Sequence, residues 1–241
     1  MHVLVTPDYQ TLSHTAADLV LKAIRNKPDL CLALPTGSTP LGMYEEIVRQ
    51  YRDQRLDFSR LHTFNLDEYL DLAPGHPRSF HTYMRRQFFD HVNILPENID
   101  IPSGTPGIDA GIESERYERN IAQAGGIDLL IVGIAANAHI AFNEPGSSFD
   151  SRTRAVDLAP ETIANAQQQF GSERAPSRAI TMGIGTMLEA RRVLLLASGA
   201  AKSVAVKRAL RGPVSPTVPA SALQLHPRVI ALLDEAAAPP Q

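Results

Sequence analysis

The sequence predicts an α/β protein with a doubly wound, mostly parallel sheet and helices on both faces. Short apolar runs typical of buried strands alternate with segments whose apolar residues recur at helical spacing. This alternation favours parallel strands joined by crossover helices. The 241 residues contain no internal repeat, no low-complexity linker and no sharp change in composition. We therefore expect one Rossmann-like domain over residues 1–241.

Elements in the first half of the chain follow this alternation. Residues 2–5 form a short apolar run that predicts the first strand, and residues 11–27 carry apolar side chains at helical spacing. The apolar run at 30–34 predicts a second strand, which the helical segment 41–51 follows. A third strand is predicted at residues 60–65.

The second half continues in the same way. Residues 79–92 place aromatic and apolar side chains in helical register, and residues 109–124 form a charged helix that ends at Gly125-Gly126. A further helix at 202–211 ends at Gly212-Pro213. The remaining predicted strands are the apolar runs at residues 127–134, 192–198 and 228–234.

Composition excludes several classes of protein. A net charge of −3 gives no electrostatic basis for binding nucleic acid or an anionic membrane. No apolar run approaches the length of a membrane span, and the N-terminus lacks the apolar core of a signal peptide. The single cysteine, Cys31, lies in an apolar run and is best interpreted as a buried small hydrophobe. We expect a cytoplasmic protein, because one cysteine cannot form an internal disulfide.

A candidate anion site follows the second predicted strand. Residues 34–42 read Leu-Pro-Thr-Gly-Ser-Thr-Pro-Leu-Gly, and Thr39 is predicted to cap a helix whose first residue is Pro40. The N–H groups and hydroxyls of Thr36, Gly37, Ser38 and Thr39 would point at the positive end of that helix. The alternative is an ordinary capped helix. The number of donors favours a phosphate site.

Two adjacent carboxylates follow the third strand, in Asn65-Leu66-Asp67-Glu68-Tyr69. Adjacent residues of an extended segment point to opposite faces, so only one of them is expected to face a cleft. A solvated acidic loop is the simpler interpretation. The location at the carboxyl end of a strand favours a catalytic base instead.

The segment from Gly133 to Asp150 is the most informative part of the chain. Here His139 and Glu144 lie five residues apart in a turn-rich loop after a predicted strand. A histidine exchanges protons near neutral pH, and a carboxylate beside it sets its orientation and charge. The pair predicts proton-transfer chemistry, although solvated or locally paired side chains in an ordinary loop are the simpler alternative.

Lys202 follows Ser198-Gly199-Ala200-Ala201 at the start of a predicted helix, where a lysine contacts a phosphate or simply lies on the surface. The histidines show no ligand spacing that indicates a metal site. The chain has no Walker-type loop, no Gly-x-Gly-x-x-Gly fingerprint and no Gly-x-Ser-x-Gly elbow. We expect no metal and no organic cofactor.

Together these segments resemble the glucosamine-6-phosphate deaminase (isomerase) family. The resemblance covers nearly the whole chain, and its longest motif, His-Ile-Ala-Phe-Asn-Glu-Pro-Gly-Ser-Ser-Phe, is highly specific. The matching segments are residues 34–44, 64–69, 139–149, 151–154, 179–186 and 221–227.

The resemblance implies conversion of glucosamine 6-phosphate and water into fructose 6-phosphate and ammonia, without a metal or organic cofactor. His139 would assist opening of the pyranose ring, with Glu144 setting its orientation. Asp67 would move a proton between C2 and C1 through an enolamine. The loop residues Thr36, Gly37, Ser38 and Thr39 and the side chain of Lys202 would hold the phosphate.

Two positions depart from the family pattern. Asn137 stands where the family carries an aspartate of the ring-opening group, so the site loses a negative charge but keeps a hydrogen-bonding side chain. Gln167 stands where an arginine grips the substrate phosphate, which removes a bidentate charged contact. We expect Gln167 to contact the phosphate more weakly than arginine would.

Two other functions compete with a deaminase. A 6-phosphogluconolactonase-like hydrolase shares the fold superfamily, but a lactonase needs no enolising carboxylate. A catalytically silent sugar-phosphate sensor would explain the changes at Asn137 and Gln167.

The resemblance also bears on assembly. Longer family members are hexamers activated by N-acetylglucosamine 6-phosphate, through serines, an arginine, a lysine and a tyrosine of a C-terminal extension. This chain keeps Ser147 and Arg154, has Val156 in place of the lysine, and ends at Gln241. We expect a monomer or small homo-oligomer whose small-molecule ligand is a sugar phosphate.

Overall fold

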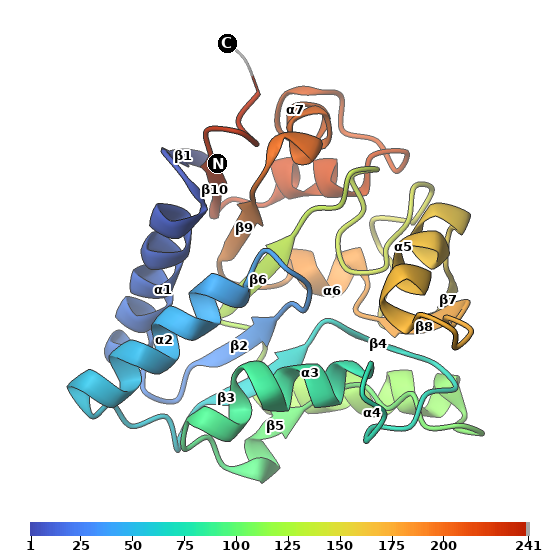
Figure 1. Cartoon of the computed structure of the whole chain (residues 1–241), viewed down its shortest axis with the longest axis horizontal. Helices are drawn as coiled ribbons and strands as arrows, with labels where there is room; N and C mark the ends of the chain where they lie inside the picture. Colours follow the sequence, from blue (N-terminus) through green and yellow to red (C-terminus); the bar gives the residue numbers. More distant parts are fainter. Residues whose placement is uncertain (240–241) are drawn as a thin grey trace.

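Seven parallel strands form the central sheet of the computed structural model, which describes residues 1–239 (Figure 1). Their order is β1-β10-β9-β6-β2-β3-β5. All six predicted strands belong to this sheet, and the short β5 joins its edge beside β3. The strands are β1 (His2–Thr6), β2 (Cys31–Leu34), β3 (His62–Asn65), β5 (Ile99–Asp100), β6 (Leu129–Gly133), β9 (Val193–Ala197) and β10 (Val229–Asp234).

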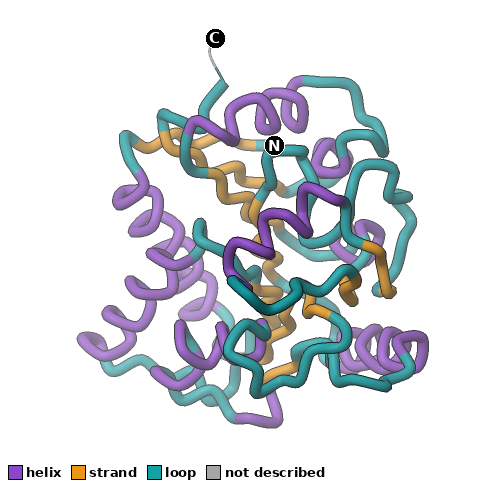
Figure 2. Tube along the Cα trace, turned by 45° about the vertical axis from the view of Figure 1, so that its right-hand side comes forward, coloured by secondary structure: helices purple, strands orange, loops and turns teal. Residues whose placement is uncertain are grey.

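Helices cover both faces of the sheet, which confirms the predicted fold class (Figure 2). The α-helices are α1 (Tyr9–Asn26), α2 (Leu41–Gln54), α3 (Phe80–Gln87), α4 (Ala110–Gln123), α5 (Pro160–Phe170), α6 (Ile184–Leu188) and α7 (Ser203–Arg211). Short 3-10 helices are η1 (Phe89–His91), η2 (Pro96–Asn98), η3 (Ala200–Lys202) and η4 (Pro219–Leu225).

Alternate residues of the central strands β2, β6, β9 and β10 enter two separate hydrophobic cores. In β2, Cys31 and Ala33 join the core that includes α4, α6 and α7, whereas Leu32 and Leu34 join the core of α1, α2 and α3. Because both faces are buried, these strands are continuously apolar, which made them recognisable in the sequence. Cys31 is 1% exposed, as expected of a small buried hydrophobe.

A second, antiparallel sheet was not predicted. It contains β4 (Asp67–Tyr69), β8 (Arg178–Thr181) and β7 (Arg154–Asp157), in that order. Its strands have three or four residues and carry polar side chains, so they lack the apolar runs that identify buried strands. Together with α5, this sheet forms a smaller layer beside the carboxyl ends of the parallel strands (Figure 1).

One predicted helix ends early, and one predicted helix cap is wrong. The segment predicted as a helix at 79–92 leaves helical conformation at Phe88, whose ring stacks on Tyr44 with centroids 5.2 Å apart. The predicted cap at Thr39 is wrong, because α2 begins at Leu41 with Pro40 as the capping residue and no side-chain cap. The loop before α2 is held instead by the hydroxyls of Tyr9 and Tyr83.

The strand order places a crevice between β2 and β6. The chain leaves β2 toward α2 on one face of the sheet, and after β6 it reaches α6 on the other face. Neighbouring strands whose connections run to opposite faces create an opening at their carboxyl ends, where ligands of α/β proteins bind.

Candidate active site

A cavity of about 600 Å³ opens at this crevice. Its walls come from the segments that follow β2, β3, β6 and β9 and from helix α5. Thr36, Gly37, Ser38, Thr39, Asp67, His139 and Lys202 line the cavity, whereas Asn137, Glu144 and Gln167 are not among its lining residues.

The loop after β2 offers unpaired donors to the cavity. Gly37 has φ of +97°, a left-handed conformation that favours glycine. Within residues 1–239, the backbone N–H groups of Thr36, Gly37, Ser38 and Thr39 donate no hydrogen bond. A cluster of free N–H groups is suited to an anion.

Asp67 also lines the cavity, as the first residue of β4 and two residues beyond the end of β3. It is 6% exposed, and the backbone around it is fixed because Met182 N–H donates to the Leu66 carbonyl at 2.7 Å. Burial, with a smaller contribution from the charge of Glu68, raises the pKa of Asp67 to about 8. No described residue hydrogen-bonds to its carboxyl group. The carboxyl is thus buried, unpaired and directed to the ligand space.

Glu68 points the other way, as the alternation of an extended segment predicts. It is 1% exposed, and its carboxylate accepts hydrogen bonds from the backbone N–H groups of Phe80 and His81 at 3.0 Å. The ring of His81 also lies 2.9 Å from it. Glu68 therefore fastens the first turn of α3, and Asp67 alone of the two carboxylates serves the cavity.

His139 and Glu144 form a hydrogen-bonded pair. Nδ1 of the histidine lies 3.0 Å from Oε2 of the glutamate, which leaves Nε2 as the ring nitrogen for a substrate. Asn137 donates to the same Oε2 at 3.0 Å and accepts from the backbone N–H of His139 at 3.1 Å. Asn137 therefore holds the carboxylate and the backbone, and makes no hydrogen bond to the imidazole.

Glu144 is ionised throughout the physiological range. Burial opposes its charge, but hydrogen bonds from His139, Thr162 and Asn137 outweigh burial and lower the pKa of Glu144 to about 2. Thr162 of α5 donates to Oε1 at 2.5 Å. The Glu144 carboxylate holds Nδ1 of His139 and so orients the ring with Nε2 free for proton transfer.

The backbone beside His139 is strained. Ala138 and Ala141 have φ of +70° and +49°, a region that residues other than glycine and asparagine rarely adopt. Such strain concentrates at functional sites, where the surrounding structure imposes it. Here it presents the imidazole at the carboxyl end of β6.

Lys202 supplies a cation at the fourth wall. It lies in η3 after β9, and burial lowers its pKa. Among residues 1–239 it has no acidic partner. A partly buried ammonium without a counterion, lining the same cavity as free N–H groups, is suited to an anionic ligand.

Helix α5 contributes a wall that the sequence did not reveal. Thr162, Asn165, Ala166 and Gln169 line the cavity, at the three- and four-residue spacing of one helix face. Helix α5 begins with Pro160 and carries mostly small and amide side chains, which do not indicate a binding surface. The spacing of these four residues was the only signal in the sequence.

Gln167, predicted to bind the substrate, does not line the cavity. One residue beyond Ala166, it is rotated by about 100° away from the cavity face of α5. Its side-chain amide donates to the carbonyls of Gly171 and Glu173 at 2.8 and 2.7 Å and accepts from the N–H of Ala175 at 3.0 Å. Gln167 therefore fixes the loop after α5, and it does not line the cavity in which a phosphate is expected to bind.

Residues 1–239 contain no group of three or more His, Cys, Asp or Glu side chains that could hold a metal ion. In the same part of the chain, no helix combines the length and apolar character that crossing a membrane requires.

The chain is similar to known proteins over almost its whole length. Residues 8–231 match the family of glucosamine-6-phosphate isomerases and 6-phosphogluconolactonases. The chain is 46% identical over 240 residues to a glucosamine-6-phosphate deaminase of Thermoanaerobacter pseudethanolicus, covering 99% of this chain and 94% of the relative. A deaminase of Clostridium botulinum is 45% identical over 239 residues, covering 99% and 98%.

Solved structures of a deaminase and of a lactonase are also similar to this chain. A monomeric glucosamine-6-phosphate deaminase superposes with a TM-score of 0.95 at 42% identity, over 98% of both chains. A 6-phosphogluconolactonase from Trypanosoma cruzi superposes with a TM-score of 0.76 at 19% identity, over 98% of this chain and 95% of the other. At that identity the lactonase shows a shared fold alone.

Proposed function

This chain belongs to the family of glucosamine-6-phosphate isomerases and 6-phosphogluconolactonases, and we propose that it is a glucosamine-6-phosphate deaminase. In the reaction, glucosamine 6-phosphate and water give fructose 6-phosphate and ammonia. The similarity to deaminases over almost the whole chain supports this function over lactone hydrolysis.

The observation that carries the proposal is the state of Asp67. It is a buried carboxyl with no hydrogen-bond partner among the described residues, and it lines the same cavity as His139, the partner of Glu144. An unpaired buried carboxylate is destabilised and therefore basic. Isomerisation requires such a base, because a weakly acidic C–H must be deprotonated, whereas lactone hydrolysis does not.

Ring opening is the first step. Nε2 of His139 takes the proton from the C1 hydroxyl, the bond between C1 and the ring oxygen breaks, and the imidazolium returns the proton to that oxygen. Glu144 holds Nδ1 and stabilises the transient positive charge, and Asn137 and Thr162 hold Glu144 in turn.

Isomerisation and loss of ammonia follow. Ionised Asp67 removes the proton from C2 of the open-chain aldehyde, and the ammonium at C2 passes a proton to O1, so that a neutral cis-enolamine forms. Protonated Asp67 then delivers its proton to C1. The resulting iminium at C2 adds water, and ammonia leaves as the C2 carbonyl of fructose 6-phosphate forms. The free N–H groups of residues 36–39 and the ammonium of Lys202 bind the phosphate.

Product analysis tests the proposal. Incubation with glucosamine 6-phosphate should release ammonia and fructose 6-phosphate in equal amounts, and 6-phosphogluconolactone should not be hydrolysed faster than in buffer. Lactone hydrolysis without ammonia release would establish the lactonase instead. Binding of the sugar phosphate without any turnover would establish the sensor.

Replacing Asn137 with aspartate should move the pH profile of turnover toward higher pH and raise its maximum. Aspartate keeps the acceptor for the His139 N–H but places a second carboxylate against Glu144, where Asn137 now donates at 3.0 Å. The two carboxylates share a proton at low pH, and above that titration their combined charge favours the imidazolium.

The measurement is kcat against pH for Asn137→Asp, with Asn137→Ala as the control that removes both hydrogen bonds. The alanine variant should lose activity at every pH. A profile of the aspartate variant that matches the parent in height and position would show that charge at residue 137 has no influence on ring opening.

We further propose a cytoplasmic monomer or small homo-oligomer without allosteric activation. The relative with 42% identity is monomeric, and the single cysteine suits a reducing compartment. Arg154 hydrogen-bonds to Asn143 and Ser147, but Val156 of β7 provides no cation for an anionic effector.

We expect hyperbolic kinetics that N-acetylglucosamine 6-phosphate does not alter, because an effector without differential affinity for two states shifts no equilibrium. Initial rates against substrate concentration, with and without that sugar, provide the measurement. Sigmoidal rates that become hyperbolic on its addition would contradict the expectation.

A further inference from the structure

The loop between β2 and α2 is held by side chains of α1, α2, α3 and the end of β3. Four backbone carbonyls from Leu34 to Ser38 accept a hydrogen bond from a side-chain amide or phenol group, and those of Leu34 and Ser38 also accept one from a backbone N–H. The pairs are Asn65 Nδ2 to Leu34 O at 3.2 Å, Tyr44 OH to Pro35 O at 2.6 Å, Tyr83 OH to Gly37 O at 2.6 Å and Tyr9 OH to Ser38 O at 3.1 Å.

These bonds determine where the loop N–H groups point. In a trans peptide the carbonyl and the following N–H face opposite directions. Holding the carbonyls of Gly37 and Ser38 therefore fixes the N–H groups of Ser38 and Thr39. Neither N–H has a partner among residues 1–239, so both are available to a ligand.

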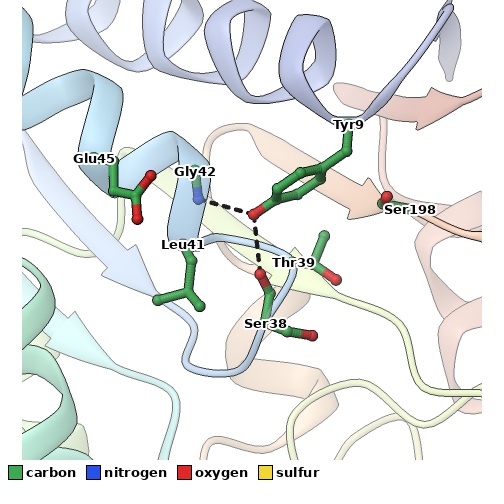
Figure 3. A pocket seen from close by; sticks show the side chains of 7 residues that line it. All are labelled: Tyr9, Ser38, Thr39, Leu41, Gly42, Glu45 and Ser198. Carbon is green, nitrogen blue, oxygen red and sulfur yellow. Dashed lines mark hydrogen bonds between the residues drawn. The ribbon is translucent and has the colours of Figure 1, made fainter.

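Tyr9 joins three elements at this point (Figure 3). Its hydroxyl donates to the Ser38 carbonyl and accepts from the N–H of Gly42 in the first turn of α2, at 2.8 Å. A Cβ at Gly42 would lie 2.4 Å from Ser13 Oγ and 3.2 Å from the Tyr9 hydroxyl, so glycine permits this approach. Tyr9 thereby anchors the loop and α2 to the start of α1.

The hollow around Tyr9 is not a second anion site. It has a volume of about 390 Å³, and Glu45 lines it together with Ser38, Thr39 and Ser198. The carboxylate of Glu45 disfavours an anion, and Figure 3 shows the phenol of Tyr9 lying over the loop between Gly42 and Ser38. Tyr9 thus approaches the loop from outside the main cavity, of whose lining it is not part.

We propose that Tyr9 and Tyr83 are positioning residues for the substrate phosphate. Their hydroxyls orient the peptide units of residues 37–39 so that the N–H groups meet the phosphate oxygens. Tyr9 comes from α1 and Tyr83 from α3, so the loop is braced by both helices. This inference rests on the proposed function in that it takes the anion to be the phosphate of the sugar.

The test uses Tyr9→Phe and Tyr83→Phe, which remove one hydroxyl each and keep the ring. Each variant should raise the Kd for inorganic phosphate, measured by calorimetry, and the KM for glucosamine 6-phosphate by about fivefold, the value of one neutral hydrogen bond. The values of kcat, and of kcat/KM for unphosphorylated glucosamine, should stay at those of the parent.

Tyr51→Phe is the matched control. Tyr51 lies on α2, its ring packs against Phe58 with centroids 5.0 Å apart, and among residues 1–239 its hydroxyl has no hydrogen bond. Its removal should leave the Kd for phosphate unchanged. The double variant Tyr9→Phe/Tyr83→Phe should weaken phosphate binding by less than the product of the single effects, because both hydroxyls hold adjacent peptides of one loop.

Phosphate binding is measured without turnover, so failure of the positioning role can be distinguished from failure of the proposed function. Weaker phosphate binding in the two variants supports the positioning role even if the parent releases no ammonia, a result that would overturn only the proposed function. Unchanged phosphate Kd and KM in both variants would overturn the positioning role. Equal loss of kcat on phosphorylated and unphosphorylated sugar, with phosphate Kd unchanged, would also overturn it and indicate a general effect on the fold.

Discussion

Replacing Asp67 with asparagine is expected to lower the turnover of glucosamine 6-phosphate by about a hundredfold or more, as for loss of a general base. Asparagine has nearly the same shape and cannot accept the C2 proton. Exchange of the C2 hydrogen with solvent deuterium should therefore stop as well. Continued exchange at the parental rate would assign the base to another residue.

The same variant should be more stable than the parent at neutral and alkaline pH. Burial raises the pKa of Asp67 to about 8 from an ordinary value of 3.8. Between these pH values the native carboxyl keeps a proton that the unfolded chain has released, so the stability of the parent falls as pH rises. Asparagine does not ionise and avoids this loss.

Urea unfolding at pH 5 and pH 9 measures this effect. The gain in free energy of unfolding should be larger at pH 9, on the order of a few kcal/mol. Asp71→Asn is the control, because Asp71 is exposed and its φ of +61° suits asparagine equally well. Asp71→Asn should have the same activity as the parent protein and the same dependence of stability on pH. If Asp67→Asn gained no more stability at pH 9 than at pH 5, burial would not oppose ionisation of the Asp67 carboxyl in the folded protein.

Replacing Lys202 with glutamine is expected to raise the KM for glucosamine 6-phosphate between tenfold and about a hundredfold, the value of a hydrogen bond to a charged group. The half-buried ammonium has no acidic partner among the described residues, so its charge is available to the phosphate. Activity on unphosphorylated glucosamine should be unaffected, since that sugar lacks the anion.

Lys207→Gln provides the control, because Lys207 lies on the exposed side of α7 and outside the cavity. A difference between the two variants that appears only with the phosphorylated sugar assigns Lys202 to the phosphate. If both substrates lose activity equally at Lys202, the lysine acts on the reacting carbons or on the fold instead.

The parallel sheet was predictable because its central strands are apolar on both faces. In β6, Leu129 and Ile131 enter one core and Leu130 and Val132 the other, so the sequence shows an uninterrupted apolar run. The antiparallel sheet gives no such run. Strand β4 consists of Asp67, Glu68 and Tyr69, whose pairing with β8 depends on residues more than a hundred positions away.

The site was predictable where it follows strands of the parallel sheet. Such loops share one edge of the sheet, so Gly37, Asp67 and His139 were expected to lie near one another, and all three line one cavity. The wall from α5 depends on tertiary packing and was missed. The predicted cap at Thr39 failed for the same reason, since Tyr9 and Tyr83, far away in sequence, hold that loop.

Cys31 gives the chain a practical property. It is the single cysteine, it is buried in β2, and burial together with the nearby charge of Asp128 raises the pKa of its thiol to about 12. Because thiol reagents attack the thiolate, the folded protein should be almost inert toward maleimides. A cysteine introduced at the exposed Gln168 would then be the one reactive thiol. A fluorophore attached there would report how α5 responds to substrate, without prior removal of the native cysteine.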